Sequence, residues 1–200
     1  MAADLGDDGT DLRRFPHLEW RKRLAGTLQD FARFELHAAT NVGLGDLPRH
    51  DDRDAVLDAV GRAGADDVVL KLPGGLDTQL GANWDGGVEL SYGQWQKLAL
   101  ARGFMREQPL LLVLDEPTAA LDAETEHALF ERYADAARTG SNGGRITILV
   151  SHRFSTVRMA GLIVVLDGAR LVEMGTHDEL MARRGQYSQL YGIQAAAYAK

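Results

Sequence analysis

The chain has 200 residues, of which 45% are hydrophobic and 26% charged, and its formal net charge is −7. This length suits one domain, or one domain with a subdomain, and the composition is that of a globular protein. The acidic balance argues against broad nucleic-acid binding, and the absence of cysteine excludes disulfides, thiolate metal sites and cysteine nucleophiles. Residues 1–11 carry four aspartates instead of an apolar signal core, and no apolar run approaches the roughly 18 residues of a membrane span.

The first half of the chain predicts a helical subdomain over about residues 32–108, beside a core formed by residues 1–31 and 109–200. Residues 51–63 predict a helix whose apolar positions are Val56, Ala59 and Val60. A short helix is predicted over residues 68–72 and a longer one over residues 92–107. Between them, residues 73–87 contain five glycines without a clear period, which indicates a loop.

Three short apolar runs in the second half, residues 110–114, 146–150 and 162–166, predict strands buried in a parallel sheet. Residues 122–138 predict a helix between the first two runs, with Asp122 as its N-cap and Leu129 and Tyr133 on one face. Strand, helix and strand in this order predict an α/β unit with a right-handed crossover.

The C-terminal part predicts a hairpin followed by a helix. Asp167-Gly168 predicts the hairpin turn, and residues 169–174 the strand after it. In the terminal helix, one face holds apolar residues and two tyrosines lie beside it: Leu190, Ile193 and Ala197, with Tyr187 and Tyr191. This face would either dock on the chain or bind a partner, and its amphipathic spacing favours docking.

Two carboxylates, Asp115 and Glu116, directly follow the strand predicted over residues 110–114, and Pro117 ends that strand. Ligands of open α/β sheets bind at the carboxyl edge of the strands. There one carboxylate can hold Mg²⁺ and the next can take a proton from an attacking water. An acidic turn after a core strand is the structural alternative, but the Glu-Pro-Thr and Ala-Leu-Asp sequences that follow favour a nucleotide site.

The helix over residues 92–107 opens with Ser91-Tyr92-Gly93-Gln94. Ser91 and Gln94 have the spacing of a capping box, in which each side chain bonds a free backbone N–H of the other residue. The same N–H groups and the helix dipole form an anion site, and Gly93 would let a phosphate approach the backbone closely. The residues alone are compatible with both interpretations, a helix cap and a phosphate site.

The order of short motifs resembles that of the ABC ATPases. Leu90-Ser91-Tyr92-Gly93-Gln94 is similar to the LSGGQ signature of that family, with Tyr92 in place of a glycine. Residues 111–116 resemble the Walker B strand with its catalytic glutamate. Further similarities are the Q-loop at Leu28-Gln29-Asp30, the D-loop at Ala120-Leu121-Asp122 and the switch histidine at Ser151-His152. The exporter type is indicated by Glu19-Trp20-Arg21, Asn41-Val42-Gly43-Leu44-Gly45 and residues 175–180.

This resemblance implies an α/β fold, an incomplete P-loop NTPase (RecA-like) core with parallel strands and an ABC-type α-helical subdomain. It implies an ATP-hydrolysing subunit of an exporter that uses ATP and Mg²⁺. The implied catalytic residues are Glu116 and His152, the metal ligands are Asp115 and Gln29, and the nucleotide-binding residues are Gln29, Ser91, Gly93, Gln94 and Asp122. The implied partners are a second nucleotide-binding domain, paired head to tail, and a transmembrane permease at the cytoplasmic face of the cell membrane, whereas nucleic acid is not expected.

A P-loop of the form G-x-x-x-x-G-K-[ST] does not occur in the sequence, because none of the four lysines, Lys22, Lys71, Lys97 and Lys200, stands in such a frame. We therefore expect the C-terminal part of a nucleotide-binding domain that is inactive alone and whose signature serves a partner's nucleotide. One alternative is a regulatory or degenerate module that pairs with a complete partner without hydrolysing ATP itself. The other is a soluble ABC ATPase of DNA repair or translation.

Overall fold

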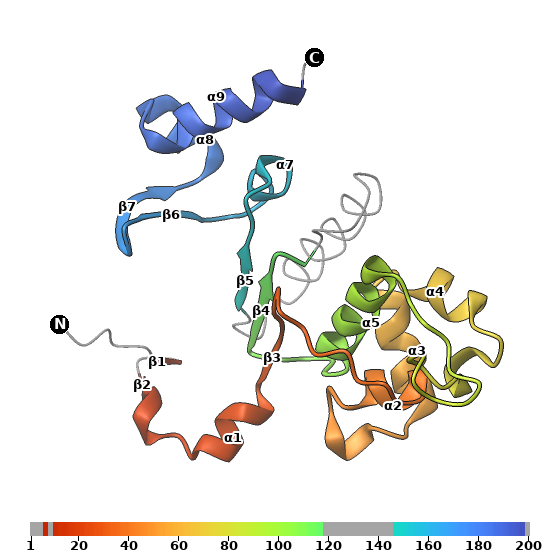
Figure 1. Ribbon diagram of the computed structural model, residues 1–200. Helices are drawn as coiled ribbons and strands as arrows, with labels where there is room; N and C mark the ends of the chain where they lie inside the picture. The colour runs from red at the N-terminus through yellow and green to blue at the C-terminus, as the bar shows by residue number, and fades with distance from the viewer. Residues whose placement is uncertain (1–5, 8–9, 118–145, 199–200) are drawn as a thin grey trace.

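A three-stranded parallel sheet connects the two halves of the fold. The computed structural model describes residues 6–7, 10–117 and 146–198 (Figure 1). The strands are β3 (Leu24–Thr27), β4 (Leu111–Asp115) and β5 (Ile146–Val150), in the spatial order β3-β4-β5. This confirms the α/β class and the strands predicted near residues 110–114 and 146–150. The helix predicted over residues 122–138, and with it the hand of the crossover, lies outside the described residues.

The strand β3 is not predicted by the apolar pattern, because Leu24-Ala25-Gly26-Thr27 contains two small residues with low strand propensity. It becomes a strand through pairing with β4, in a register that places Leu24 opposite Leu111 and Thr27 opposite Leu114. These partners are more than 80 residues apart in the sequence, so no local signal reports the pairing.

Four helices gather on one side of the molecule (Figure 1): α2 (Ala38–Gly43), α3 (Arg53–Arg62), α4 (Asp66–Lys71) and α5 (Tyr92–Phe104). The short 3₁₀ turns η2 (Leu47–Arg49) and η3 (Gly75–Asp77) lie between them. Their buried side chains form one core that continues to Leu114 of β4 and includes Val42, Val56, Val60, Val68, Leu76, Leu80, Leu98, Leu100 and Met105. The predicted helices over residues 51–63, 68–72 and 92–107 are thus confirmed, and α2 is an additional one.

Hydrogen bonds from side chains fix the N-terminus of α5. Ser91 Oγ accepts from the N–H of Gln94 at 3.3 Å, and Gln94 Oε1 accepts from the N–H of Ser91 at 2.8 Å. This is the predicted capping box, which satisfies N–H groups that have no partner inside the helix.

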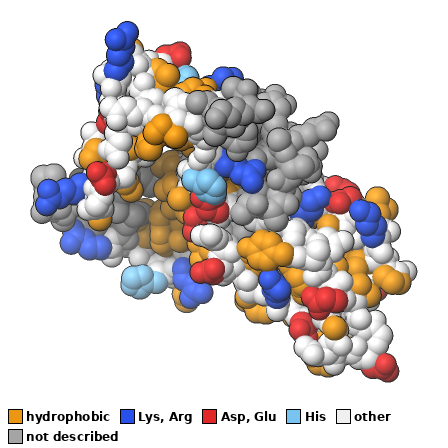
Figure 2. All heavy atoms as spheres, turned by 45° about the horizontal axis from the view of Figure 1, so that its top comes forward, with side chains coloured by type: hydrophobic (Ala, Val, Ile, Leu, Met, Phe, Trp, Pro, Cys, Tyr) orange, Lys and Arg blue, Asp and Glu red, His pale blue; other side chains and the backbone are white. Residues whose placement is uncertain are grey.

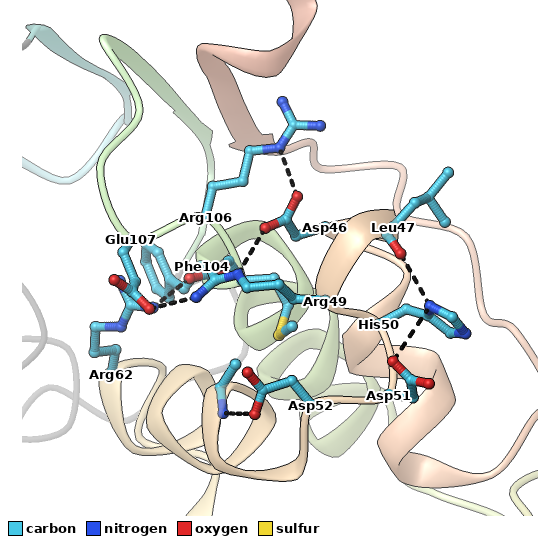
Figure 3. A network of polar contacts seen from close by, with 12 residues as sticks. Asp46, Leu47, Arg49, His50, Asp51, Asp52, Arg62, Phe104, Arg106 and Glu107 are labelled. Carbon is cyan, nitrogen blue, oxygen red and sulfur yellow. Dashed lines mark hydrogen bonds and ion pairs between the residues drawn. The ribbon is translucent and has the colours of Figure 1, made fainter.

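Two arginines from neighbouring elements fix the C-terminus of α5 (Figure 3). Arg62 donates to the carbonyl oxygen of Phe104 at 2.6 Å, and Arg49 donates to that of Met105 at 2.7 Å. Arg49 also bonds Glu107 at 2.5 Å, and this hydrogen bond holds the pKa of the Glu107 carboxyl below its ordinary value of 4.5. The guanidinium groups thus bond carbonyl oxygens at the helix end, where the last carbonyls have no partner within the helix.

The sheet and α5 approach each other at the backbone. A Cβ at Gly103 would lie 2.3 Å from Thr27 Oγ1, so only glycine fits at that point of the helix. Nearby, Thr27 Oγ1 donates to the carbonyl oxygen of Ala99 at 3.4 Å. The helix is therefore seated directly on β3.

The strands β6 (Ile163–Asp167) and β7 (Arg170–Gly175) form a separate antiparallel hairpin. The prediction that residues 162–166 form a buried parallel strand is therefore wrong. Val164 and Leu166 are 52% and 66% exposed, because the sheet that β6 joins consists of β6 and β7 alone within the described residues. The turn is also shifted by one residue from its predicted place, since Gly168 and Ala169, both with positive φ, are its central residues.

The chain ends in two helices, α8 (His177–Arg183) and α9 (Gln186–Tyr198). Tyr187 of α9 is 2% exposed and packs with Ile163 and Leu180, and Tyr191 packs against the same cluster. Burial raises the pKa of the Tyr187 hydroxyl. Docking of the terminal helix is confirmed, but not through the predicted face, because Leu190 and Ile193 are 44% and 70% exposed.

The N-terminal part contains small elements that were not predicted: β1 (Gly6–Asp7), β2 (Thr10–Asp11), η1 (Leu12–Arg14) and α1 (His17–Lys22). Among the described residues, no helix combines the length and the apolar character that crossing a membrane requires.

Figure 2 shows apolar side chains gathered in a recessed part of one face of the molecule. Apolar side chains on β5 are also exposed. Ile146, Ile148 and Val150 are 60%, 45% and 49% exposed. In the part of the chain that the structure describes, β5 pairs with β4 alone. The expectation that this strand is buried is therefore wrong, and within the described residues β5 is the outer strand of its sheet.

Candidate functional site

The carboxyl ends of β4 and β5 bring together three of the residues singled out by the sequence. Asp115 ends β4 and lies opposite Val150, which ends β5. The next residue, Glu116, donates its N–H to the carbonyl oxygen of Val150 at 3.0 Å. His152 follows β5 after one intervening residue. Asp115, Glu116 and His152 thus occupy the edge of the sheet where α/β proteins bind ligands.

The side chains of Glu116 and His152 contact each other. His152 Nδ1 lies 2.7 Å from Glu116 Oε1. The Glu116 side chain is only 15% exposed, whereas that of His152 is 70% exposed. A largely buried carboxylate that is oriented by an imidazole has the arrangement of a general base held in place by a second group.

The backbone of Glu116 is in the left-handed region, with φ of 46°. For a residue other than glycine this conformation costs on the order of 1–2 kcal/mol. Two hydrogen bonds hold it: the N–H of Glu116 donates to Val150, and its carbonyl oxygen accepts from Gln96 Nε2 at 3.2 Å. Strain that the surroundings maintain in this way is typical of functional positions.

The residue Gln96 connects the start of α5 to the same edge of the sheet. Its side chain is 3% exposed and reaches Glu116 from the second turn of the helix. Ser91, Gly93 and Gln94 lie at the start of this helix, and Ser91 is exposed. Sequence reasoning did not single out Gln96, although a polar residue among the buried positions of α5 was the available signal.

The predicted Q-loop residue Gln29 lies in a different pocket of about 310 Å³, which is lined by Gln29, Asp30, Phe31, Ala32, Arg33 and Tyr92. The rings of Phe31 and Tyr92 are 5.4 Å apart, and the Arg33 guanidinium lies over the Tyr92 ring at 5.4 Å. Tyr92, which stands where the family signature has glycine, therefore contacts the segment after β3. Asp115 and Glu116 are not among the residues that line this pocket.

Asp115 and Gln29 carry oxygen atoms of the kind that Mg²⁺ binds, but Asp115 does not line the pocket that holds Gln29. Asp115 ends β4, and Gln29 follows the neighbouring strand β3 by two residues. In nucleotide sites Mg²⁺ usually takes one or two carboxylates, and waters and phosphate oxygens complete its shell. No group of three or more His, Asp or Glu side chains gathers as a metal cage within the described ranges. The remaining predicted nucleotide-binding residue, Asp122, lies outside the described residues.

Comparison with known proteins shows that the chain is similar to transporters. The sequence model described as ABC transporter matches residues 6–119. The chain is 42% identical over 195 residues to the ATP-dependent lipid A-core flippase of Pseudomonas fluorescens (strain Pf0-1), covering 95% of this chain and 30% of the flippase. It is 37% identical over 190 residues to ABC transporter B family member 28 of Arabidopsis thaliana, covering 95% of this chain and 25% of that protein.

Among solved structures, a bacterial Atm1-family ABC exporter with ATP bound matches with a TM-score of 0.80 and 33% sequence identity. The match covers 94% of this chain and 31% of the exporter chain. The chain thus spans about a quarter to a third of the length of the proteins it matches. These similarities confirm the exporter type predicted from the motifs.

Proposed function

The chain belongs to the ABC transporter family, and on that premise we propose that it is the ATP-binding and ATP-hydrolysing part of an exporter, which couples hydrolysis to transport across a membrane. The observation that carries the proposal is the 2.7 Å contact between Glu116 and His152 at the carboxyl edge of the sheet. Similarity to a lipid A-core flippase and to an Atm1-family exporter supports the same function.

In the proposed reaction, Glu116 accepts a proton from the water that attacks the terminal phosphate of ATP. Its largely buried carboxylate is suited to this task because the surroundings limit competing solvent. His152 orients this carboxylate, and its exposed ring is free to donate to the terminal phosphate. Asp115 and Gln29 would hold Mg²⁺, which neutralises phosphate charge when it is bound.

We assign the start of α5 to the nucleotide of a second domain. ABC domains pair head to tail, so Ser91, Gly93 and Gln94 would close over ATP held by the P-loop of the partner. The exposure of Ser91 and the helix N-terminus, which favours anions, support this assignment. Without a P-loop sequence, the 200 residues alone are expected to be inactive.

The second proposed partner is a transmembrane permease, which would hold the chain at the cytoplasmic face of the membrane. The pocket beside Gln29 and Tyr92 lies on the segment that, in this proposal, links the site to that partner. A regulatory module that pairs with a complete domain without hydrolysing ATP is the second candidate. The missing P-loop sequence favours it, whereas the Glu116–His152 contact favours hydrolysis.

The test is the substitution Glu116→Gln in the chain as purified from its host, in detergent, with any membrane protein that accompanies it. Loss of the general base is expected to lower the kcat for ATP about 100-fold or more, with little change in nucleotide binding. The matched control is Glu19→Gln, an exposed carboxylate paired with Lys22 on α1. Equal turnover in the wild type and Glu116→Gln would support the non-hydrolysing module instead.

A further inference from the structure

The segment that carries His152 is held by the C-terminal helix. The short helix α7 (Phe154–Val157) begins two residues after His152. The side-chain amide of Gln194, on α9, spans this junction: its Oε1 accepts from the N–H of Phe154 at 2.9 Å, and its Nε2 donates to the carbonyl oxygen of His152 at 3.1 Å. One amide group thus bonds the backbone on both sides of Arg153.

Aromatic packing gives α9 a firm position against the same segment. The Phe154 ring lies 5.4 Å from the ring of Tyr187 and 5.5 Å from that of Tyr191, both in edge contacts. The Tyr187 hydroxyl lies 2.9 Å from His177 Nδ1 on α8. Because Tyr187 is buried, Gln194 is presented to the backbone by a docked helix.

The position of the His152 ring depends on its backbone. The His152 side chain is 70% exposed, so packing restrains it little. Its contact with Glu116 therefore depends on where the backbone of residue 152 is held. Within the segment, the N–H of Arg153 donates to Ser151 Oγ at 3.0 Å. Gln194 adds two bonds from outside the segment, one to Phe154 and one to His152.

We propose that Gln194 is a positioning residue for His152: the C-terminal helix sets the approach of the imidazole to Glu116, and thereby the rate of hydrolysis. This inference rests on the proposed role of His152. Glutamine suits the position because its amide both accepts and donates, whereas glutamate only accepts and leucine does neither. The C-terminal helix is then a part of the catalytic apparatus that does not touch the nucleotide.

The structural part of the test uses the 200-residue chain. In Gln194→Leu the amide of Phe154 is expected to exchange hydrogen about tenfold faster, because it loses its acceptor. The ring resonances of His152 are expected to move at the same time. Gln189→Leu, at an exposed position of the same helix, makes the same substitution and is expected to leave both signals unchanged.

Gln194→Leu could also loosen α9, and faster hydrogen exchange at the Leu190 amide would reveal this. A second variant keeps the test decisive in that case. Gln194→Glu keeps the acceptor for Phe154 and loses the donor to His152. Its expected signature is normal protection of the Phe154 amide together with displaced His152 ring signals. Unmoved His152 signals in this variant would overturn the proposal.

The kinetic part uses the assembly purified from the host. Gln194→Leu is expected to lower kcat about tenfold and to leave the KM for ATP unchanged, because the nucleotide contacts are not altered. An unchanged kcat in an active wild-type background would overturn the inference. If the wild type itself shows no Glu116-dependent turnover, the proposed function fails, and the exchange and resonance measurements still decide whether Gln194 positions His152.

Discussion

Glu116 combines a left-handed backbone, a largely buried carboxylate and a histidine partner. The left-handed backbone lowers the stability of the fold, because a residue with a Cβ is strained at this φ whereas glycine is not. Its neighbours Val150 and Gln96 hold the backbone in place from two directions. The residue thus places a carboxylate where the sheet ends, at a conformational cost.

This cost can be measured by comparing Glu116→Gly with Glu116→Ala. Both variants remove the carboxylate and its contact with His152, but only glycine relieves the positive φ. The free energy of unfolding in urea is expected to be about 1 kcal/mol higher for Glu116→Gly than for Glu116→Ala. Equal stabilities would mean that residue 116 abandons the left-handed conformation once its side chain is shortened.

At this scale, local motifs were predictable and contacts across the chain were not. The capping box of Ser91 and Gln94 depends on residues three positions apart, and the structure contains it. Gln96 bonds a residue 20 positions away, and Gln194 bonds residues 40 and 42 positions away, so that only the folded chain brings them into contact. The sequence indicates that Glu116 and His152 matter, but not what holds them.

Among the elements, α5 connects the signature residues to the sheet. Its N-cap is Ser91, its first turn carries Gly93, its second turn carries Gln96, and its C-terminus is fixed by Arg49 and Arg62 (Figure 3). The exposed Ser91 has a complete structural role as N-cap, so its proposed contact with phosphate has to be separated from that role by substitution.

Aspartate separates the two roles of Ser91, because it caps a helix as well as serine does but carries a negative charge. Ser91→Ala is expected to lower the free energy of unfolding by about 1 kcal/mol. Ser91→Asp is expected to keep that stability and yet to lower ATP turnover of the purified assembly about tenfold, by repelling the partner's phosphate. Urea unfolding and a turnover assay measure the two effects.

The capping box of α8 provides a matched control. Thr176 Oγ1 accepts from the N–H of Glu179 at 3.4 Å, and Glu179 Oε2 accepts from the N–H of Thr176 at 2.9 Å. Thr176→Asp introduces the same charge at a helix start that we do not assign to nucleotide, so turnover is expected to persist. If Ser91→Asp also left turnover unchanged, Ser91 would be a cap and nothing more.

Elements were predictable where apolar periodicity is local. The helices α3 and α5 show it, and so do the strands β4 and β5. Apolar periodicity does not indicate β3, whose small residues depend on pairing with β4, and it predicts the wrong sheet for β6, which pairs antiparallel with β7. Such a run indicates a strand, but not the strand's partner or its direction.

At the scale of the whole molecule, charge works against nucleotide binding by the isolated chain. The net charge is −7, and Asp115 and Glu116 stand at the proposed site. The lysines within the described residues pair with other carboxylates: Lys22 with Glu19 at 2.7 Å, and Lys97 and Lys71 with Asp67 at 2.8 and 4.0 Å. A triphosphate would meet carboxylates without the positive cradle that a P-loop supplies.

Titration of the purified chain with a fluorescent ATP analogue is therefore expected to show no saturation at micromolar concentrations. The physical reason is repulsion between the phosphates and the acidic edge of the sheet, which no P-loop lysine compensates. An ABC domain that contains a P-loop, titrated alongside, establishes that the assay detects binding. Micromolar affinity for the chain alone would contradict the expectation.

The exposed strands have a consequence for how the chain behaves in solution. Within the described part of the chain, β5 with Ile146, Ile148 and Val150 is an outer strand, and Val164 and Leu166 lie on a two-stranded hairpin. Apolar side chains therefore occur on strands that have a partner on one side in these sheets. Such edges adhere to one another, and adhesion grows with concentration. The degree of self-association therefore affects every measurement on this chain. Protein concentration has to be controlled as carefully as salt concentration and pH.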